Sequence, residues 1–115
     1  MLERDNGCII NIASVSGIIG PPNFTDYAAS KHGVMGFTKT LVAEYLLRGI
    51  RAHVILPGGT VSQMQREASP KADPATLIQP EDIADAAVFL ATQPASAHTM
   101  EIVVNKGLQT RYLDD

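Results

Sequence analysis

The sequence predicts an α/β fold in which three parallel strands alternate with two helices, in the order β-α-β-α-β. Three short apolar runs are rich in β-branched residues, the segments between them have helical patterning, and glycine or proline marks the junctions. Parallel strands joined by helices are expected to have right-handed connections and to form half of a three-layer sandwich. The 115 residues allow one domain at most, residues 1–115, without internal repeats.

The first strand is predicted from Cys8 to Ala13, an apolar run typical of a strand buried on both faces of a parallel sheet. The preceding MLERDNG is typical of the end of a helix and its exit turn, so we expect Met1 to be internal to a longer chain. Cys8 is the only cysteine, which excludes an internal disulfide and suits a reducing compartment. We expect Cys8 to be a small buried hydrophobic residue.

A loop from Ser14 to Thr25 leads into a helix predicted from Asp26 to about Leu47. Gly49 suits the end of this helix, where a left-handed residue is often needed. Gly33 and Gly36 lower the helix propensity, so we expect close packing to require them.

The second strand is predicted from Arg51 to Leu56 and the third from Glu101 to Val104. Between them, Pro80 opens a helix that ends before Pro94. The polar stretch from Ser62 to Gln79 predicts a mobile segment, either a lid over a substrate or a solvated linker.

Ser14, Tyr27 and Lys31 form a triplet spaced by thirteen residues and then four. Because Tyr27 and Lys31 are four apart on a predicted helix, their side chains share one face. A free phenol is scarcely ionised near neutral pH, and a neighbouring cation favours the phenolate. The pair therefore suits general acid and base catalysis, with Ser14 holding a substrate oxygen. This chemistry indicates hydride transfer at an alcohol or carbonyl carbon.

With these residues the chain resembles the short-chain dehydrogenase/reductase family, whose Ser and Tyr-x-x-x-Lys have this spacing. Four features carry the resemblance in order: the strand ending at Ser14, the thirteen-residue offset, Ala-Ser-Lys around Lys31, and Pro57-Gly58 after the next strand. The resemblance implies the second half of a Rossmann-type doubly wound parallel sheet. It also implies an NAD(P)-dependent oxidoreductase that interconverts a secondary alcohol and a ketone, with Tyr27 as the proton-transfer residue.

The resemblance implies cofactor contacts from Tyr27 and Lys31, which holds the nicotinamide ribose, and from the loop after the second strand. The loop residues are Pro57, Gly58, Thr60 and Ser62, whose hydroxyls would meet the carboxamide or phosphates. The final strand, EIVV, is similar to a branch of NADP-dependent 3-hydroxy acid and serine dehydrogenases, which slightly favours NADP. The N-terminal glycine-rich half that cradles a pyrophosphate is lacking, so we expect the isolated chain to be inactive.

Ser16 and the three histidines have structural rather than catalytic interpretations. Ser16, a rival to Ser14, is expected to be a loop residue bonded to its own backbone. His32, His53 and His98 show no ligand spacing, so no metal site is expected, and His53 is expected to be a hydrogen-bonded structural residue.

A second class of function remains open, a truncated non-enzymatic remnant that acts only through protein association. A nucleotide-sugar epimerase shares Tyr-x-x-x-Lys, but the short tail after Tyr27 argues against it. The formal charge of −3 gives no basic surface for nucleic acid, and no apolar stretch is long enough for a membrane span. We expect a cytoplasmic homo-oligomer, a dimer or tetramer, whose subunits meet through a helix face containing Met35, Thr38 and Val42.

Overall fold

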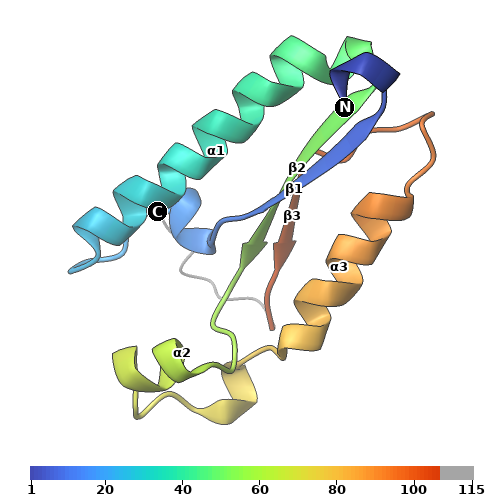
Figure 1. Cartoon of the computed structure of the whole chain (residues 1–115). Coiled ribbons are helices and arrows are strands. Elements are labelled where there is room, and N and C mark those ends of the chain that lie inside the picture. Colours follow the sequence, from blue (N-terminus) through green and yellow to red (C-terminus); the bar gives the residue numbers. More distant parts are fainter. Residues whose placement is uncertain (107–115) are drawn as a thin grey trace.

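The computed structural model describes residues 1–106 and shows a three-stranded parallel sheet with a helix packed on each face (Figure 1). The strands and helices are β1 (Gly7–Ile12), β2 (Ile50–Pro57), β3 (Glu101–Val104), α1 (Thr25–Tyr45), α2 (Gln63–Ala68) and α3 (Pro80–Thr92). Short 3-10 turns are η1 (Leu2–Arg4), η2 (Val15–Gly17), η3 (Leu46–Arg48) and η4 (Pro74–Thr76). The predicted α/β fold of parallel strands and helices is therefore confirmed.

The sheet has the order β1-β2-β3, so β2 is its central strand. β1 pairs with β2 from Gly7 opposite Ile50 to Ile12 opposite Ile55. None of the six residues of β2 after Arg51 is an aspartate, glutamate, lysine or arginine, and the strand is buried almost throughout. A strand covered on both faces needs such a continuous apolar run, because neither face meets water.

Every residue of β2 from Ala52 to Pro57 is buried. Side chains alternate between the two faces of a strand, so Val54 and Leu56 lie on one face and His53 and Ile55 on the other. On the first face, Val54 and Leu56 form the hydrophobic core with Ala13 and Met35, and Val34 packs against them (the α1 face).

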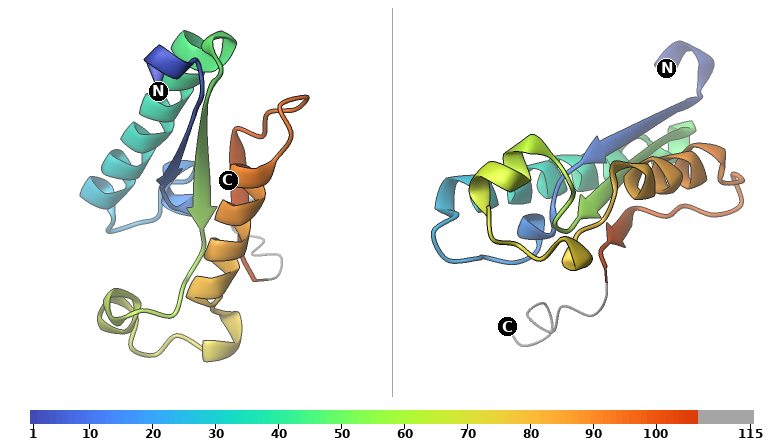
Figure 2. Two further views of the ribbon diagram at one scale, coloured as in Figure 1. Left: turned by 45° about the vertical axis from the view of Figure 1, so that its right-hand side comes forward. Right: turned by 90° about the horizontal axis from the view of Figure 1, so that it is seen from below.

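The opposite face of the sheet is covered by α3. The guanidinium of Arg51 on β2 donates hydrogen bonds to the carbonyl oxygens of Leu90 and Gln93, at 3.3 and 3.2 Å. Leu90 is fully buried there. Figure 2 shows the resulting arrangement, in which α1 and α3 lie on opposite sides of the strands.

Local backbone conformation and hydrogen bonding determine where the helices begin and end. α1 continues into η3 and stops at Gly49, which adopts the predicted left-handed conformation with φ 77°. A side chain at Gly49 would overlap the carbonyl oxygen of Asp5, so close approach also requires glycine. α3 begins at Pro80, and the Asp82 carboxylate accepts a 2.7 Å hydrogen bond from the backbone N–H of Gln79.

Three expectations about packing are wrong. Met35 and Thr38 are 5% and 0% exposed, so they belong to the inward face of α1 and cannot meet another subunit. A Cβ at Gly33 or Gly36 would have nothing within 4 Å, so within the described residues no close packing requires these glycines. Cys8 is exposed, and it lies on β1 at the edge of the described sheet.

The segment after β2, for which the sequence predicts a mobile stretch, contains regular structure. It contains α2 and η4, and Thr60 forms a parallel bridge with Ile78 that closes the segment at its base. The side chain of Ser62 caps α2 by accepting a hydrogen bond from the backbone N–H of Gln65 at 3.0 Å. Sequence reasoning missed this helix, although serine at an N-cap position was an available signal.

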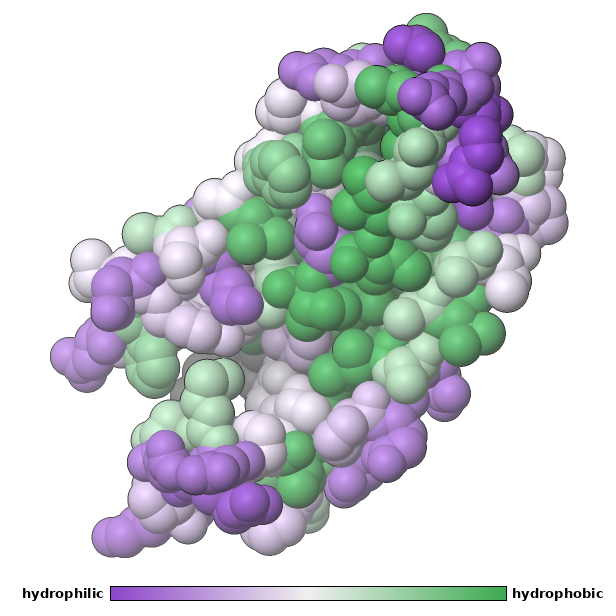
Figure 3. Space-filling view, in the orientation of Figure 1, coloured by the Kyte–Doolittle hydropathy of each residue, from purple (hydrophilic) through white to green (hydrophobic). Residues whose placement is uncertain are grey.

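The surface between α1 and α3 is strongly apolar. Figure 3 shows a hydrophobic strip running between the two helices, over the strands of the sheet. Within residues 1–106, no helix is both long and apolar enough to cross a lipid bilayer.

Candidate active site

The predicted site residues gather where the strands end. The backbone N–H of Ala13 donates a 2.8 Å hydrogen bond to the carbonyl oxygen of Ile55, which holds the end of β1 beside the end of β2. Ser14 follows at once, and Pro57 is the last residue of β2. The carboxyl ends of parallel strands are where open α/β sheets bind ligands, so Ser14 and Pro57 lie at the expected edge.

Ser14 is held in a defined position. It is buried, and its Oγ accepts a hydrogen bond of 3.1 Å from the backbone N–H of Ser16. The carbonyl oxygen of Ser14 accepts a second hydrogen bond from Gly17, at 2.8 Å, which closes η2. Because its Oγ accepts from the backbone, the Ser14 hydroxyl keeps its own hydrogen to donate to a ligand.

Ser16 differs from its expected role. Its backbone N–H, not its side chain, makes the hydrogen bond, and the acceptor is the Ser14 side chain. Ser16 therefore helps to orient Ser14 through its main chain, which a change of the Ser16 side chain would leave in place.

Tyr27 and Lys31 lie together in the first turns of α1. The Nζ atom of Lys31 is 5.5 Å from the centre of the Tyr27 ring, over its face. The ring of Phe24 packs edge-on against Tyr27, with centroids 6.2 Å apart and an interplanar angle of 70°. Tyr27 and Lys31 are both half-buried, so the cation and the phenol share one partly dry environment. The predicted pairing on one helix face is thus present in the structure.

Gly17 brings the Ser14 turn against this part of α1. A Cβ at Gly17 would lie 3.0 Å from Cγ of Met35 and 3.1 Å from the carbonyl oxygen of Lys31, both tighter than ordinary contact. The backbone of η2 therefore rests directly on the helix turn that carries Lys31. Sequence reasoning missed this role of Gly17, and its position directly after Ser-Val-Ser was the available signal.

The loop after β2 is anchored at both ends. The backbone N–H of Gly58 donates a 2.8 Å hydrogen bond to the carbonyl oxygen of Val104, and a Cβ at Gly58 would overlap the Asn105 side chain. The hydroxyl of Thr60 donates to the carbonyl oxygen of Gly58 at 3.0 Å. The Thr60 hydroxyl hydrogen is therefore used in a local hydrogen bond. The Ser62 hydroxyl oxygen accepts one hydrogen bond, from Gln65, and its own hydrogen has no acceptor among the described residues.

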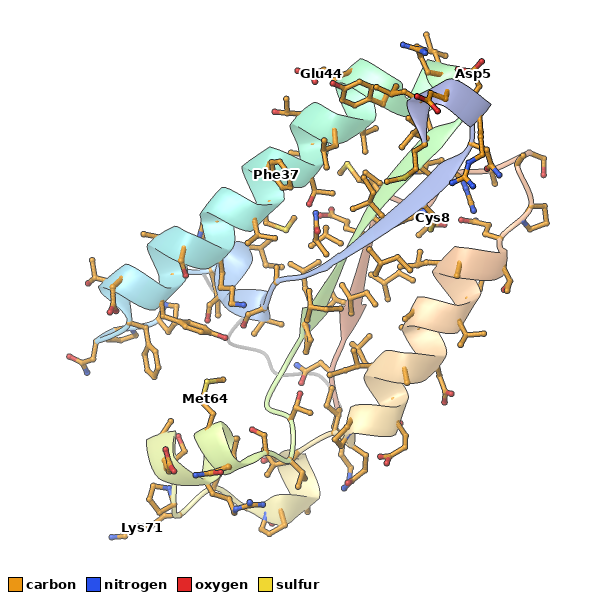
Figure 4. All side chains as sticks on the ribbon, viewed as in Figure 1. Asp5, Cys8, Phe37, Glu44, Met64 and Lys71 are labelled. Carbon is orange, nitrogen blue, oxygen red and sulfur yellow. The ribbon has the colours of Figure 1, made fainter. Side chains whose placement is uncertain are left out.

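The elements that carry these residues frame one end of the sheet. Figure 4 shows the side chain of Met64 projecting from α2 toward the region where α1 begins, and Met64 is 65% exposed. The chemistry present at this end is a buried hydroxyl at Ser14, a phenol beside an ammonium, and the hydroxyls of the Thr60 loop. Such a donor set fits the nicotinamide and ribose end of a dinucleotide, which offers hydroxyl and amide partners.

His53 is a buried structural residue, as expected. Its Nδ1–H donates to the carbonyl oxygen of Thr99 at 2.6 Å, and its ring lies 4.8 Å from that of His98, which donates to the carbonyl oxygen of Ala52 at 2.9 Å. Burial lowers the pKa of His53 from its ordinary 6.5; the hydrogen bond to Thr99 opposes this, and the nearby His98 and Arg51 add to it.

The two histidines do not form a metal centre with other ligands. Among residues 1–106, no three His, Cys, Asp or Glu side chains are grouped so that they could hold a metal ion. His32 lies apart on α1, where its Nδ1 is 2.8 Å from the carbonyl oxygen of Ala28.

Comparison with curated proteins finds relatives among oxidoreductases. A 3-oxoacyl-acyl-carrier-protein reductase of Synechocystis sp. is 40% identical over 105 residues, 85% of this chain and 42% of that protein. The 3beta-hydroxysteroid dehydrogenase 1 of Eggerthella lenta is 46% identical over 116 residues, 92% of this chain and 44% of that protein. A relative from Xanthobacter autotrophicus, 36% identical over 84% of this chain and 48% of its own length, is named an inactive 2-(S)-hydroxypropyl-CoM dehydrogenase.

Solved structures share the fold. An actinorhodin polyketide ketoreductase with NADPH has a TM-score of 0.80 and 30% identity, over 91% of this chain and 48% of its own. A gluconate 5-dehydrogenase from Beutenbergia cavernae, described as putative and with NADP bound at low occupancy, has a TM-score of 0.83 and 30% identity, over 100% of this chain and 49% of its own. The chain thus spans less than half the length of these relatives.

The short chain dehydrogenase family model matches residues 1–73, which include Ser14, Tyr27, Lys31 and the loop after β2. This match covers more than half of the chain and agrees with the fold and with the curated relatives. The chain therefore belongs to the short-chain dehydrogenase family.

Proposed function

We propose that this chain is the catalytic C-terminal half of an NAD(P)-dependent oxidoreductase that interconverts a secondary alcohol and a ketone. The observation that carries the proposal is the Lys31 ammonium 5.5 Å from the centre of the Tyr27 ring, on the helix against which the Ser14 turn packs. The cofactor supplies or accepts the hydride. The residues of this chain bind and orient the cofactor and the substrate, and they move the proton.

Each residue of the triplet has a role that its surroundings support. Tyr27 passes a proton between its hydroxyl and the substrate oxygen. Lys31 holds its positive charge over the face of the Tyr27 ring and would bind the nicotinamide ribose. Ser14 donates its free hydroxyl hydrogen to the substrate oxygen, since its Oγ already accepts from Ser16.

The cofactor contacts follow from the same arrangement. We assign the nicotinamide ribose to Lys31 and Tyr27, and the carboxamide or phosphates to the loop of Pro57, Gly58, Thr60 and Ser62. NADP is favoured over NAD, in agreement with the NADPH and NADP named for two structural neighbours. The names of the relatives include reductases and a hydroxysteroid dehydrogenase, which act on carbonyl and alcohol groups and support the substrate class.

We also propose that the protein is cytoplasmic and forms a homo-oligomer. The exposed face of α1, with Phe37 57% exposed and open space at Gly33 and Gly36, is the better subunit surface now that Met35 and Thr38 are seen to be buried.

The test is a pair of tyrosine variants in a full-length enzyme that contains this chain. Tyr27→Phe keeps the ring and removes the hydroxyl, so kcat should fall at least ~100-fold, the lower range for general acid–base catalysis. Tyr45→Phe, on the same helix but at its far end, should leave kcat unchanged. Ser14→Ala should slow the reaction, whereas Ser16→Ala should keep the backbone bond and most of the activity. Retention of activity by Tyr27→Phe would refute the assignment.

A further inference from the structure

One polar contact joins α1 to the sheet. The side-chain amide of Asn11, on β1, donates a 2.9 Å hydrogen bond to Oγ1 of Thr38, on α1. Among residues 1–106 this is the only hydrogen bond between α1 and a strand. Apolar side chains form the core of the α1 face beside it. The Asn11–Thr38 pair is therefore the one directional contact between the first helix and the sheet in the described part of the chain.

The Thr38 hydroxyl is fully used in this contact. Thr38 is 0% exposed, and while its Oγ1 accepts from Asn11 it also donates to the carbonyl oxygen of Val34, at 2.8 Å. Replacing both partners of a buried hydrogen bond by apolar groups of the same shape can leave stability nearly unchanged. Stability alone therefore does not require a polar pair at this position.

The apolar contacts of α1 do not define its position by themselves. The hydrophobic effect is non-directional, and α1 carries apolar residues on more than one side, since Met35 is buried whereas Phe37 is 57% exposed. A hydrogen bond, in contrast, requires a defined distance and angle between its two groups. The Asn11–Thr38 bond thus fixes how far α1 slides and rotates relative to β1.

The pair is close in sequence to the site residues on both elements. Asn11 is three residues before Ser14, which follows the end of β1. Thr38 lies about two helical turns after Lys31, on the helix that also carries Tyr27. Any slide or rotation of α1 at Thr38 therefore changes the separation of Tyr27 and Lys31 from Ser14.

We propose that Asn11 and Thr38 are positioning residues that hold Tyr27 and Lys31 at the working distance from Ser14. They act through the helix and the strand, without contact with the substrate or the cofactor. The proposal rests on the proposed function, because it concerns the geometry of that reaction. A misplacement of ~1 Å caused by a change far from the chemistry can cost ~100-fold in rate.

A double-mutant cycle in a full-length enzyme that contains this chain tests the proposal. Thr38→Val leaves the Asn11 amide without its acceptor, and Asn11→Leu leaves Thr38 without its donor, so each single variant should lower both Tm and kcat. The double variant replaces the pair by two apolar side chains, so its Tm should return close to that of the parent. Its kcat should stay ~10–100-fold below the parent, because the directional contact is still missing.

Two threonine variants are the controls. Thr38→Ser keeps the hydroxyl and should retain most of kcat. Thr40→Val removes an exposed hydroxyl of the same helix that bonds only to the carbonyl oxygen of Gly36, and it should leave kcat unchanged. All rates are measured at a temperature at which circular dichroism shows each variant to be folded, so that unfolding does not contribute to the loss of kcat.

An NADPH titration followed by fluorescence adds a measurement that needs no turnover. Because Lys31 is assigned to the nicotinamide ribose, its displacement in the double variant should raise the Kd for NADPH, whereas Thr40→Val should not change it. This titration decides the positioning proposal even for an enzyme that reduces no ketone.

Three results would overturn the positioning proposal: recovery of both Tm and kcat in the double variant, equal kcat for Thr38→Val and Thr38→Ser, or equal Kd for NADPH in the parent and the double variant. The proposed function fails separately. A parent enzyme that binds NADPH but reduces no ketone would refute the activity, while a raised Kd in the double variant would still support the positioning role of the pair.

Discussion

Acidification should destabilise the fold through His53. In its neutral form His53 holds its proton on Nδ1, which donates to Thr99, so a second proton must bind to Nε2. That nitrogen is buried, and within the described residues it has no hydrogen-bond partner. A cation formed there would be desolvated and would lie beside His98 and Arg51, which explains why the pKa of His53 is lowered.

The sign follows from proton binding. Below the unfolded pKa of 6.5 the unfolded chain binds a proton at His53 that the folded chain does not, so lower pH favours unfolding. The free energy of unfolding should fall by up to ~1.4 kcal/mol per pH unit from this group, until the pH reaches the lowered folded pKa. Above pH 6.5 both states are neutral at His53, and its contribution is constant. The change over one pH unit is therefore a substantial part of the ~5–15 kcal/mol free energy of unfolding that is typical of proteins.

Urea unfolding of the folded protein at pH 7.5, 6.5 and 5.5 measures this slope. His53→Gln should flatten it, because glutamine does not titrate. His32→Gln is the control, since His32 is exposed on α1, and it should preserve the slope. An equal slope in the parent and in His53→Gln, or a slope that disappears in His32→Gln, would refute the reasoning.

Two further substitutions test the packing around the site. Gly17→Val would overlap the helix turn at Met35 and Lys31, so it should lower both stability and kcat, whereas Gly20→Val, with nothing within 4 Å, should change neither. Thr38→Val removes the Oγ1 that accepts from Asn11 and should lower the free energy of unfolding by ~1–3 kcal/mol, while the exposed Thr40→Val should have a smaller effect. Thermal melts measure the stability of each variant, and steady-state kinetics measure kcat. Equal losses of stability for the two variants of either pair would contradict the structure.

Local sequence determined the catalytic arrangement. Tyr27 and Lys31 are four residues apart, and the geometry of an α-helix places such side chains together whatever surrounds them. The apolar runs likewise determined β2 and β3, and Gly49 determined the end of the α1 region, because these signals act over a few residues.

The tertiary structure decided which faces are covered. α1 carries an apolar residue, Phe37, on its exposed side, so the sequence pattern did not reveal that Met35 and Thr38 face the sheet. The apolar run around Cys8 predicts a buried residue, yet Cys8 is exposed on β1, at the edge of the described sheet.

The pairing of His53 with His98 and the contact of Gly17 with α1 also join residues from different elements. Such contacts depend on how the helices and strands pack in space, which short-range periodicity does not encode. The sequence by itself therefore determined the three strands, the two long helices and the catalytic spacing, while the packing of α1, α3 and the loops decided burial, the lowered pKa of His53 and the open edge of β1.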